Sequence, residues 1–497
     1  MLKKTIHTPA LWPCLLVLIL AGLGLSCNND PPVGPELAKT GAIYTYIGDS
    51  PACDVLSFRT NISGLSFRRS SNSASFATVF PTDTTFVSLH MDYAGLRDYS
   101  TIMYVATLQE GSYDGAELTL QLPKIAIYDP AVDPPIRVLD GVLSTATPLV
   151  PLQPAFSVTQ TKLNVLRFDF DMAKSIQLDA QGQVTKDIIP VVTGTTVSAA
   201  ADNTYGTFDN LVGFITQVSS APVGSFIGTF NLQLHSGSGQ AIPISIKPDT
   251  SLSGVPDLKS LETGRVVEVM AKVDSAGNIV AENVEVEDRA VVEEKRIAFF
   301  GTVLPTPVQD ANGNVAQFKL YVRTMEPDRS LDVPIDSIAT VNIPSGTAFQ
   351  VSPRPDNLTP LQFGATSITV GQELLVHGQY TLVTDQPTVI DANSIYLRRQ
   401  TLQGGLSSLI NVGSDGKSGA FWLSGCSTLL QSTPIMVMTT TIDTAFINVF
   451  GLAEISPQAT LFVRGFPFYV KDATVIRGTS VPAGTLVLFA TQVRQAN

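Results

Sequence analysis

The sequence has few of the residues from which most enzyme and metal sites are built. Its 497 residues include only four histidines, four cysteines and two tryptophans. A hydrolase with a serine or cysteine nucleophile needs a histidine and a carboxylate beside it, and no G-x-S-x-G pattern occurs. The C-x-x-C and H-E-x-x-H patterns that bind zinc and the glycine-rich loops that cradle phosphate are absent as well. We therefore expect no catalytic residue of these classes, no metal and no cofactor.

Charged residues are also scarce, and acids exceed bases. Charged residues make up 15% of the chain against 44% hydrophobic residues, and the formal net charge is −12. Phosphate recognition depends on clustered lysine and arginine, so this balance argues against a nucleic-acid partner. Long amphipathic helices are hard to find, whereas β-branched residues and turn-forming residues are abundant. The composition predicts a folded, all-β protein.

The first apolar run reads as a secretory signal. Lys3 and Lys4 precede an apolar stretch over residues 11–25, which ends at small residues before Cys27. A membrane-spanning helix needs roughly 20 apolar residues, and Pro13 interrupts this shorter run. A positively charged start, an apolar centre and a small-residue end are typical of a cleaved signal peptide. We assign residues 1–26 to it.

The segment Leu25-Ser26-Cys27 resembles the lipobox of bacterial lipoproteins. The resemblance implies that Cys27 carries a lipid, becomes the new N-terminus and anchors an exported protein to a membrane, and we expect this to be the outer membrane. An ordinary signal peptide cut nearby, with Cys27 a plain thiol, is the alternative. Residues 27–40 are polar and proline-rich and would form the tether. No later apolar stretch is long enough to span a bilayer, so the rest of the chain should be soluble.

A first β domain is expected over residues 41–192. Its clearest strand alternates Leu166, Phe168 and Phe170 with Arg167 and Asp169, which is the pattern of a half-buried strand. Further strands are expected at residues 42–48, 55–67 and 85–91. A turn is expected at residues 110–115, followed by a strand that turns its leucines at positions 118, 120 and 122 to one face.

Three blocks of this domain resemble an uncharacterised bacterial lipoprotein family. They are SPACDVLSFRTNISGLSF, the turn at Gly111-Ser-Tyr113, and FDFDMAKSIQLDAQGQV. The resemblance covers roughly residues 41–190 and implies a sandwich-like β domain directly after a lipobox. It implies no activity.

The rest of the chain reads as three diverged copies of a smaller β unit, over residues 205–290, 297–400 and 405–497. Gly264 in LETGRVVEV corresponds to Gly371 in VGQELLV. The two glycines lie too far apart in the sequence for the short repeat of a solenoid. The copies look like short β-barrel repeats similar to OB-folds, and we expect separate barrels or sandwiches of five or six strands. The expected linkers are Glu287–Arg296 and Gln400–Ser408.

Two acids form the first candidate site. Asp169 and Asp171 share one strand face about 7 Å apart, by two strand rises of ~3.4 Å. Such a pair suits a glycosidase or half of a metal site. A solvated polar face is the alternative interpretation.

Aromatic residues and cysteines supply two more candidates. Trp422, Phe466 and Tyr469 would form a sugar-binding patch if they were exposed together, and core packing is the alternative. Cys53 and Cys426 could form a disulfide in an exported protein, or remain two unrelated buried thiols.

These features favour a non-enzymatic, lipid-anchored envelope protein with a binding or structural role. Its partner would be a polysaccharide or another envelope protein. The alternative is a carboxylate-based glycan hydrolase that uses Asp169 and Asp171. An assembly chaperone would need an open sheet edge that accepts a partner strand, and the sequence does not decide this.

Overall fold

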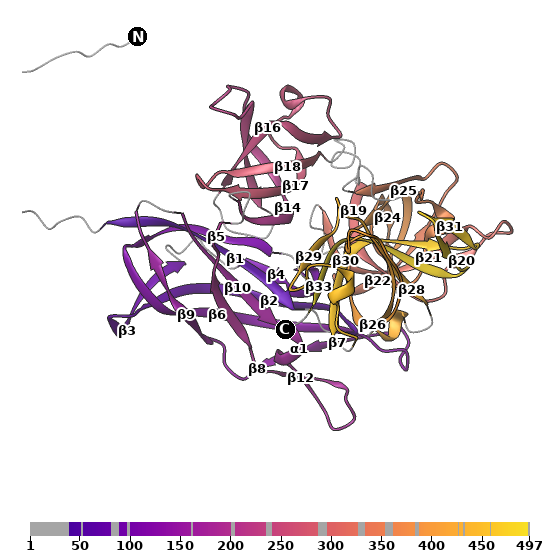
Figure 1. Cartoon of the computed structure of the whole chain (residues 1–497), viewed down its shortest axis with the longest axis horizontal. Coiled ribbons are helices and arrows are strands. Elements are labelled where there is room, and N and C mark those ends of the chain that lie inside the picture. Colours follow the sequence, from indigo (N-terminus) through magenta and orange to yellow (C-terminus); the bar gives the residue numbers. More distant parts are fainter. Residues whose placement is uncertain are drawn as a thin grey trace, which may run out of the picture. The chain divides into compact units, whose positions relative to one another are not determined.

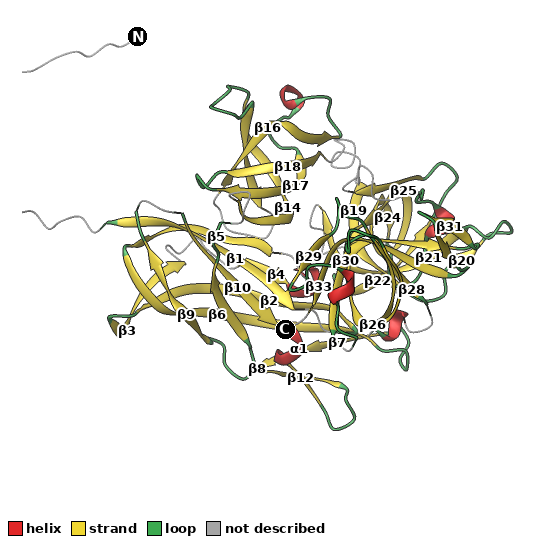
Figure 2. Cartoon of the chain, in the orientation of Figure 1, coloured by secondary structure: helices red, strands yellow, loops and turns green. Residues whose placement is uncertain are grey.

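The computed structural model describes residues 39–50, 53–80, 89–96, 100–160, 163–199, 204–234, 241–286, 296–326, 333–352, 361–382, 387–425, 427–430, 433–457 and 459–495. Strands dominate these ranges, and the helical elements are single turns of three or four residues (Figure 2). The all-β prediction is confirmed. No helix within the described ranges is long and apolar enough to cross a bilayer.

The first domain is built from two layers of strands. One layer contains β1 (Thr40–Ser50), β5 (Ser100–Gln109), β10 (Asn164–Asp171) and β13 (Val192–Thr196). The other contains β2 (Val55–Arg69), β3 (Asn72–Phe80), β4 (Leu89–Asp92), β6 (Gly111–Tyr128) and β7 (Ile136–Asp140). Strand β9 (Leu149–Val158) pairs with both β6 and β13 and joins the layers. A small separate sheet is formed by β8 (Val142–Leu143), β11 (Ile176–Leu178) and β12 (Val184–Ile188), next to α1 (Met172–Ser175).

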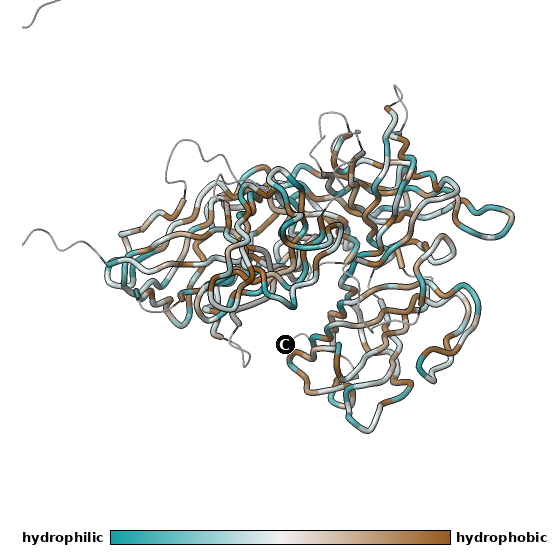
Figure 3. The backbone as a smooth tube through the Cα atoms, turned by 90° about the horizontal axis from the view of Figure 1, so that it is seen from above, coloured by the Kyte–Doolittle hydropathy of each residue, from teal (hydrophilic) through white to brown (hydrophobic). Residues whose placement is uncertain are grey.

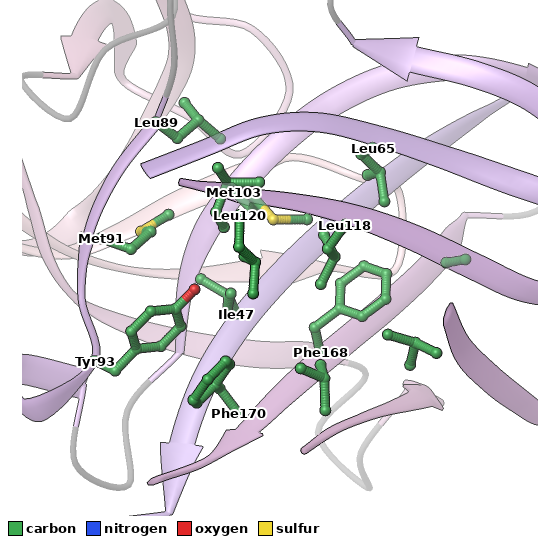
Figure 4. Packing of buried hydrophobic residues seen from close by; sticks show 14 of the residues in the cluster. Ile47, Leu65, Leu89, Met91, Tyr93, Met103, Leu118, Leu120, Phe168 and Phe170 are labelled. Carbon is green, nitrogen blue, oxygen red and sulfur yellow. The ribbon is translucent and has the colours of Figure 1, made fainter. Parts of the chain in front are cut away.

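The core of the first domain lies between these layers. The alternation in β10 is as predicted: Phe168 and Phe170 are fully buried, and Asp169 between them is half-exposed. The ring of Phe170 lies 4.5 Å from that of Tyr93, which comes from the 3-10 turn η1 (Tyr93–Leu96), and Figure 4 shows the two rings among the buried aliphatic side chains. Aromatic contacts of this kind add to the stability gained from burial.

Two local predictions in this domain are wrong. The segment predicted to turn at residues 110–115 mostly belongs to strand β6, and its bulge falls between Tyr113 and Gly115. Leu122 was expected to share a buried face with Leu118 and Leu120, but its φ is 48° and its side chain is 72% exposed. The left-handed backbone at Leu122 interrupts the alternation and turns this side chain outward. Most of the strand expected at residues 85–91 lies outside the described residues, which resume at β4.

The remaining strands form three small closed barrels. The first barrel contains β14 (Thr204–Ser219), β15 (Gly228–Leu234), β16 (Ala241–Ser253), β17 (Val266–Asp274) and β18 (Ile279–Val286). The second contains β19 (Arg296–Val303), β21 (Val315–Glu326), β22 (Ser337–Asn342), β24 (Glu373–Thr381) and β25 (Val389–Arg398). The third contains β26 (Gln400–Val412), β27 (Gly419–Gly425), β28 (Ile435–Thr439), β30 (Thr460–Val470) and β33 (Thr485–Gln495). Figure 1 labels most of these strands.

The three barrels share one pairing pattern. In each, strand one pairs with strands two and four, strand two with strand three, and strand four with strand five, all antiparallel. Strands three and five pair in parallel and close the ring. A five-stranded Greek-key barrel of this kind is the arrangement of OB-folds. Figure 3 shows the tube changing repeatedly between hydrophilic teal and hydrophobic brown along the chain.

The connection between strands three and four repeats as well. It contains a 3-10 turn in each barrel: η2 (Leu258–Ser260), η3 (Ala365–Ser367) and η5 (Leu452–Glu454). The residue that ends each turn is a buried aliphatic one, namely Leu261, Ile368 and Ile455. Three residues later, the N–H of Gly264 donates to the carbonyl of Ile215, and that of Gly371 donates to the carbonyl of Val303. The two glycines that marked the repeat in the sequence therefore hold the same position in their barrels.

The second barrel packs against the third barrel and against the first domain. Residues from Lys39 onward form one compact unit. The first barrel continues the sheet of the first domain through one bridge, from Phe208 to Ser100, and the ring of Phe208 meets that of Tyr46 edge-on at 4.7 Å. The expected linker Gln400–Ser408 is wrong, because this segment lies within strand β26. The pattern of charged residues did not reveal that the segment belongs to a strand. Most of the other expected linker, Glu287–Arg296, lies outside the described residues.

Candidate ligand-binding face

The two acids proposed as a catalytic or metal pair each have a local partner. Asp169 forms an ion pair with Arg167 (3.3 Å). The carboxylate of Asp171 accepts the backbone N–H of Lys174 (3.0 Å), which caps α1, and contacts the Lys174 ammonium at 2.7 Å. No cluster of three or more histidines, cysteines or acids that could hold a metal occurs in the described part of the chain. Both acids therefore have structural contacts in place.

The three aromatic residues proposed as a sugar-binding patch are not brought together at the surface. Phe466 is 2% exposed, and it belongs with half-buried Trp422 to a core cluster shared by the second and third barrels. Tyr469 packs against a different cluster, inside the third barrel. The alternation of β30 turns Phe466 and Tyr469 to opposite sides, so no exposed patch of all three forms.

The cysteine positions are described in part. Cys53 is half-buried and disulfide-bonded. Cys426 and Cys27 lie outside the described residues, as does the whole stretch of residues 1–38. His377 is buried in β24, where its ring packs 4.9 Å from that of Tyr396.

A buried ionic cluster joins the first domain to the second barrel. Arg323 on β21 is 2% exposed; its terminal nitrogens lie 3.1 and 3.3 Å from one carboxylate oxygen of Glu373, and its Nε lies 3.1 Å from Asp92 of the first domain. It also donates to the carbonyl of Ala94 (3.1 Å). Burial disfavours the charge of Arg323, but Glu373 and Asp92 outweigh it and raise its pKa. These charges serve to hold two parts of the chain together.

A second group of polar side chains extends this contact. Arg59 of the first domain forms a 2.6 Å ion pair with Asp336 of the second barrel. The same carboxylate accepts the hydroxyl of Ser57 (2.9 Å) and that of Tyr321, which is fully buried. Burial raises the pKa of Tyr321 well above its usual range, and the Asp336 charge acts in the same direction. The phenol therefore stays neutral and donates.

This contact covers a surface that OB-like barrels commonly use. Such barrels bind oligonucleotides and oligosaccharides on the outer face around strands two and three. In the second barrel, the row Thr302–Tyr321–Ile338 lies on that face, and Tyr321 packs there with Leu56 and Ala126 of the first domain. In the third barrel, the row Ser408–Trp422–Met436 holds the same face, and Met436 is fully buried. Both barrels thus use this face for packing within the chain.

The corresponding face of the first barrel carries no charged residue, and eight of its nine residues are exposed or half-exposed among the described parts of the chain. The register of β14, β15 and β16 places three rows of outward-facing residues side by side: Phe214–Gln233–Ala241, Gln217–Asn231–Pro243 and Ser219–Thr229–Ser245. Gln217, Ser219 and Pro243 are exposed, and most of the others are half-exposed. We call these nine residues the amide face. Three strands and three rows cover about 10 Å by about 14 Å.

Hydrogen bonds fix part of the amide face in place. The side-chain amide of Asn231 donates to the carbonyl oxygen of Gln217 (3.3 Å). The hydroxyl of Thr216, at the bulge between Ile215 and Gln217, donates to the backbone carbonyl of Asn231 (3.3 Å). These bonds leave the Asn231 carbonyl oxygen and the Gln217 amide nitrogen to interact with a ligand. A fixed acceptor and a fixed donor lie side by side.

An apolar loop borders the amide face. The connection between β14 and β15 turns back on itself through a bridge between Val223 and Phe226. Val223 is 64% exposed and Ile227 is 37% exposed. The loop between strands one and two is one of the elements with which OB-like barrels contact their ligands. The first charged residue along β16 beyond the face is Lys247.

Sequence reasoning missed the amide face because outward polar residues on a strand look like any solvated surface. A comparison of the three copies at one register could have found it. Gln233 and Tyr321 each pair with the residue that follows the strand-one glycine, Gly213 or Gly301. The position is a buried aromatic in one copy and a half-exposed amide in the other, and this difference marks the open face.

Comparison with known proteins gives a match for the first barrel. Residues 212–285 match the domain of unknown function DUF5666. The match begins within β14 and ends within β18, so it contains the amide face. No curated protein matches the chain.

Two solved structures show how distant the structural likeness is. Drosophila Unr CSD456 is 9% identical, with 58% of this chain and 97% of that chain covered and a TM-score of 0.14. The wild-type single-stranded DNA-binding protein from Thermus aquaticus is 13% identical, with 38% and 93% covered and a TM-score of 0.12. Likeness at this level carries no argument about the ligand of this chain.

Proposed function

We propose that this protein is a lipid-anchored envelope protein that binds a neutral polysaccharide on the amide face without cleaving it. The observation that carries the proposal is the contrast between the barrels. Two of them pack this face against other parts of the chain, whereas eight of the nine uncharged residues on this face of the first barrel are exposed or half-exposed. The export and the anchor rest on the signal-like start and on Cys27.

The chemistry of the amide face suits sugars better than nucleic acid. Amide and hydroxyl side chains exchange hydrogen bonds with sugar hydroxyls, and the half-buried ring of Phe214 offers an apolar surface beside Gln233. A nucleic-acid face would need lysine or arginine to neutralise phosphates, and none of the nine residues is charged. The dimensions of about 10 by 14 Å suit a short stretch of an extended chain.

Binding without cleavage is favoured by the placement of the acids. A glycan hydrolase needs two carboxyl groups about 5–9.5 Å apart on either side of the scissile bond. The amide face contains no acid, and Asp169 and Asp171 lie in the first domain with Arg167 and Lys174 as partners. The glycan hydrolase alternative has no comparable support.

The experiment uses the compact unit, Lys39–Asn497, and isothermal titration. The probes are a panel of neutral glucans, galactans and mannans, an anionic polysaccharide and a single-stranded oligonucleotide. We expect a neutral polysaccharide to bind, and the double variant Asn231→Ala/Gln217→Ala to weaken it about tenfold through the loss of two hydrogen-bonding amides. Gln350→Ala is the matched control, because Gln350 is an exposed glutamine on β23 (Ala348–Ser352), outside the amide face.

Two results would contradict the proposal. One is tighter binding of the oligonucleotide or of the anionic polysaccharide than of every neutral one. The other is a neutral polysaccharide that binds the double variant and the unchanged chain equally well.

A further inference from the structure

The third barrel presents two large apolar side chains to solvent. Ile442 is 92% exposed and Phe450 is 82% exposed, more than any other large hydrophobic side chain among the described residues. Both lie in the connection between β28 and β30, which also contains β29 (Ala445–Ile447). Neither residue is at a chain end, and hydrogen bonds hold the turns beside each of them.

The turn that carries Ile442 is held by its own polar residues. The backbone N–H of Thr440 donates to the hydroxyl of Thr444 (2.9 Å), which itself donates to the carbonyl of Ala490 (2.7 Å). The backbone N–H of Asp443 donates to the hydroxyl of Thr440 (2.9 Å). Thr441 donates its hydroxyl to the carboxylate of Asp415. Ile442 is thus displayed by a fixed turn.

The segment around Phe450 is held in a similar way. Val449 and Leu452 on either side of it are buried, so the chain is anchored at both ends of this short stretch. The backbone N–H of Leu452 donates to the carbonyl of Gly416 (2.8 Å), and that of Phe450 donates to Glu454 (3.1 Å). Asp415 and Gly416 are neighbours, so the two apolar side chains project from turns that are fastened to one loop.

We propose that Ile442 and Phe450 insert into the surface of a zwitterionic lipid bilayer and give the protein a second membrane contact beside its anchor. Two side chains on separate turns present too little area for a stable protein interface, which buries about 800 Å² on each partner. A bilayer interface accepts isolated apolar side chains, and aromatic rings are enriched there. The nearby carboxylates of Asp415 and Glu454 disfavour a strongly anionic surface.

The predicted tether explains why a weak contact would be enough. The proposal rests on the anchored state described under Proposed function. From Cys27 to Thr40 the chain can extend to at most ~45 Å, at about 3.3–3.6 Å per residue. A short flexible linker gives an effective concentration in the millimolar range. Two side chains that would bind lipid only weakly on their own can then stay inserted.

The test supplies an artificial tether, so that its result does not depend on lipidation of Cys27. Lys39–Asn497 with an N-terminal hexahistidine tag is bound to phosphatidylethanolamine/phosphatidylcholine vesicles through a nickel-chelating lipid. In the variant Phe450→Trp, we expect a blue-shifted tryptophan emission that brominated lipids quench. Val475→Trp is the control, because Val475 is 66% exposed on a different hairpin, β31 (Thr474–Ile476). Its emission should not shift.

A second measurement uses loss of binding. After imidazole releases the tag, Ile442→Ser/Phe450→Ser should leave the vesicles several times faster than the unchanged chain. Equal emission shifts for the two tryptophan variants, no shift for either, or equal release rates would overturn the proposal. Sugar binding on the amide face is measured separately, so failure here leaves that proposal intact.

Discussion

Arg323 of the second barrel and Asp92 of the first domain face each other in a buried contact, with Nε of the guanidinium 3.1 Å from Oδ2 of the carboxylate. The two residues come from strands β21 and β4, which are far apart in the sequence. The terminal nitrogens of Arg323 donate to Glu373 and to the carbonyl of Ala94, and its Cζ lies over the ring of Phe300, 5.1 Å from the ring centroid. The contact positions the second barrel on the first domain through a guanidinium that is almost fully removed from water.

Arg323→Met should destabilise the compact unit by about 3–5 kcal/mol, because it leaves the carboxylates of Asp92 and Glu373 without their buried partner. Urea denaturation measures the change. Lys124→Met is the control: its ion pair with Asp140 spans 3.8 Å, with side chains 54% and 90% exposed, and exposed pairs contribute little. Similar losses of stability in the two variants would contradict this expectation, because the buried contact would then contribute no more than the exposed one.

Gly264 and Gly371, which mark the repeat in the sequence, allow the cost of a strained backbone to be measured separately from the cost of a steric clash. Gly264 and Gly371 have φ values of 86° and 81°, where any side chain is disfavoured. A Cβ at Gly264 would meet nothing within 4 Å, whereas one at Gly371 would lie 2.5 Å from Leu430. We expect Gly264→Ala to cost about 1 kcal/mol and Gly371→Ala at least ~1 kcal/mol more.

Thermal and urea denaturation of both glycine variants check this expectation. In the background Leu430→Ala, the clash at position 371 disappears and the two alanine substitutions should cost about the same. If Gly264→Ala and Gly371→Ala were equally unstable in the normal background, the clash with Leu430 could not be the source of an extra cost at position 371.

The loop at Asp415 should be sensitive to acid. The hydroxyl of Thr441 lowers the pKa of Asp415 most, and the backbone N–H groups of Ser418 and Lys417 lower it further. A carboxylate with a lowered pKa stabilises the fold above its unfolded pKa of about 3.9, and the contribution is lost as the pH falls below that value. The stability difference between the unchanged chain and Asp415→Asn should therefore shrink as the pH is lowered from about 5 to about 2.

Urea denaturation at a series of pH values measures that difference. Asp472→Asn, at an exposed position of the same barrel, is the control. A constant difference between Asp415→Asn and the unchanged chain across this range would contradict the role of the Thr441 and Ser418 contacts.

Much of the fold could be predicted because hydrophobic and polar residues alternate locally along its strands. Phe168 and Phe170 alternate with half-exposed residues, and two glycines mark equivalent turns, so strands and repeats are visible without a structure. Leu122 shows the limit of this reasoning. Its left-handed backbone turns this one side chain to the opposite face of the strand. A leucine gives no sign of such a backbone, so the sequence could not predict it.

The packing between barrels could not be predicted, because it depends on contacts between distant strands. Tyr321 and Trp422 are aromatic residues on strands, and nothing local says that one packs on the first domain and the other on the second barrel. The amide face differs from its two counterparts in the exposure of its residues. Asn231 and Gln217 look like any polar residues on strands, and only the strand register that the three barrels share distinguishes their face from its packed counterparts.

The last prediction concerns the partner of Cys53, which is disulfide-bonded. The carboxylate of the next residue, Asp54, accepts the hydroxyl of Ser427 (3.0 Å) and the backbone N–H of Thr428 (2.6 Å). These residues directly follow Cys426 in the sequence, so we predict a Cys53–Cys426 bond. It would close a very long loop, and such bonds contribute about 3–5 kcal/mol. Peptide mapping without reductant should find the two cysteines joined. Cys53→Ala and Cys426→Ala should destabilise equally, and the double variant no more than either; additive losses, or a free thiol at Cys426, would exclude the bond.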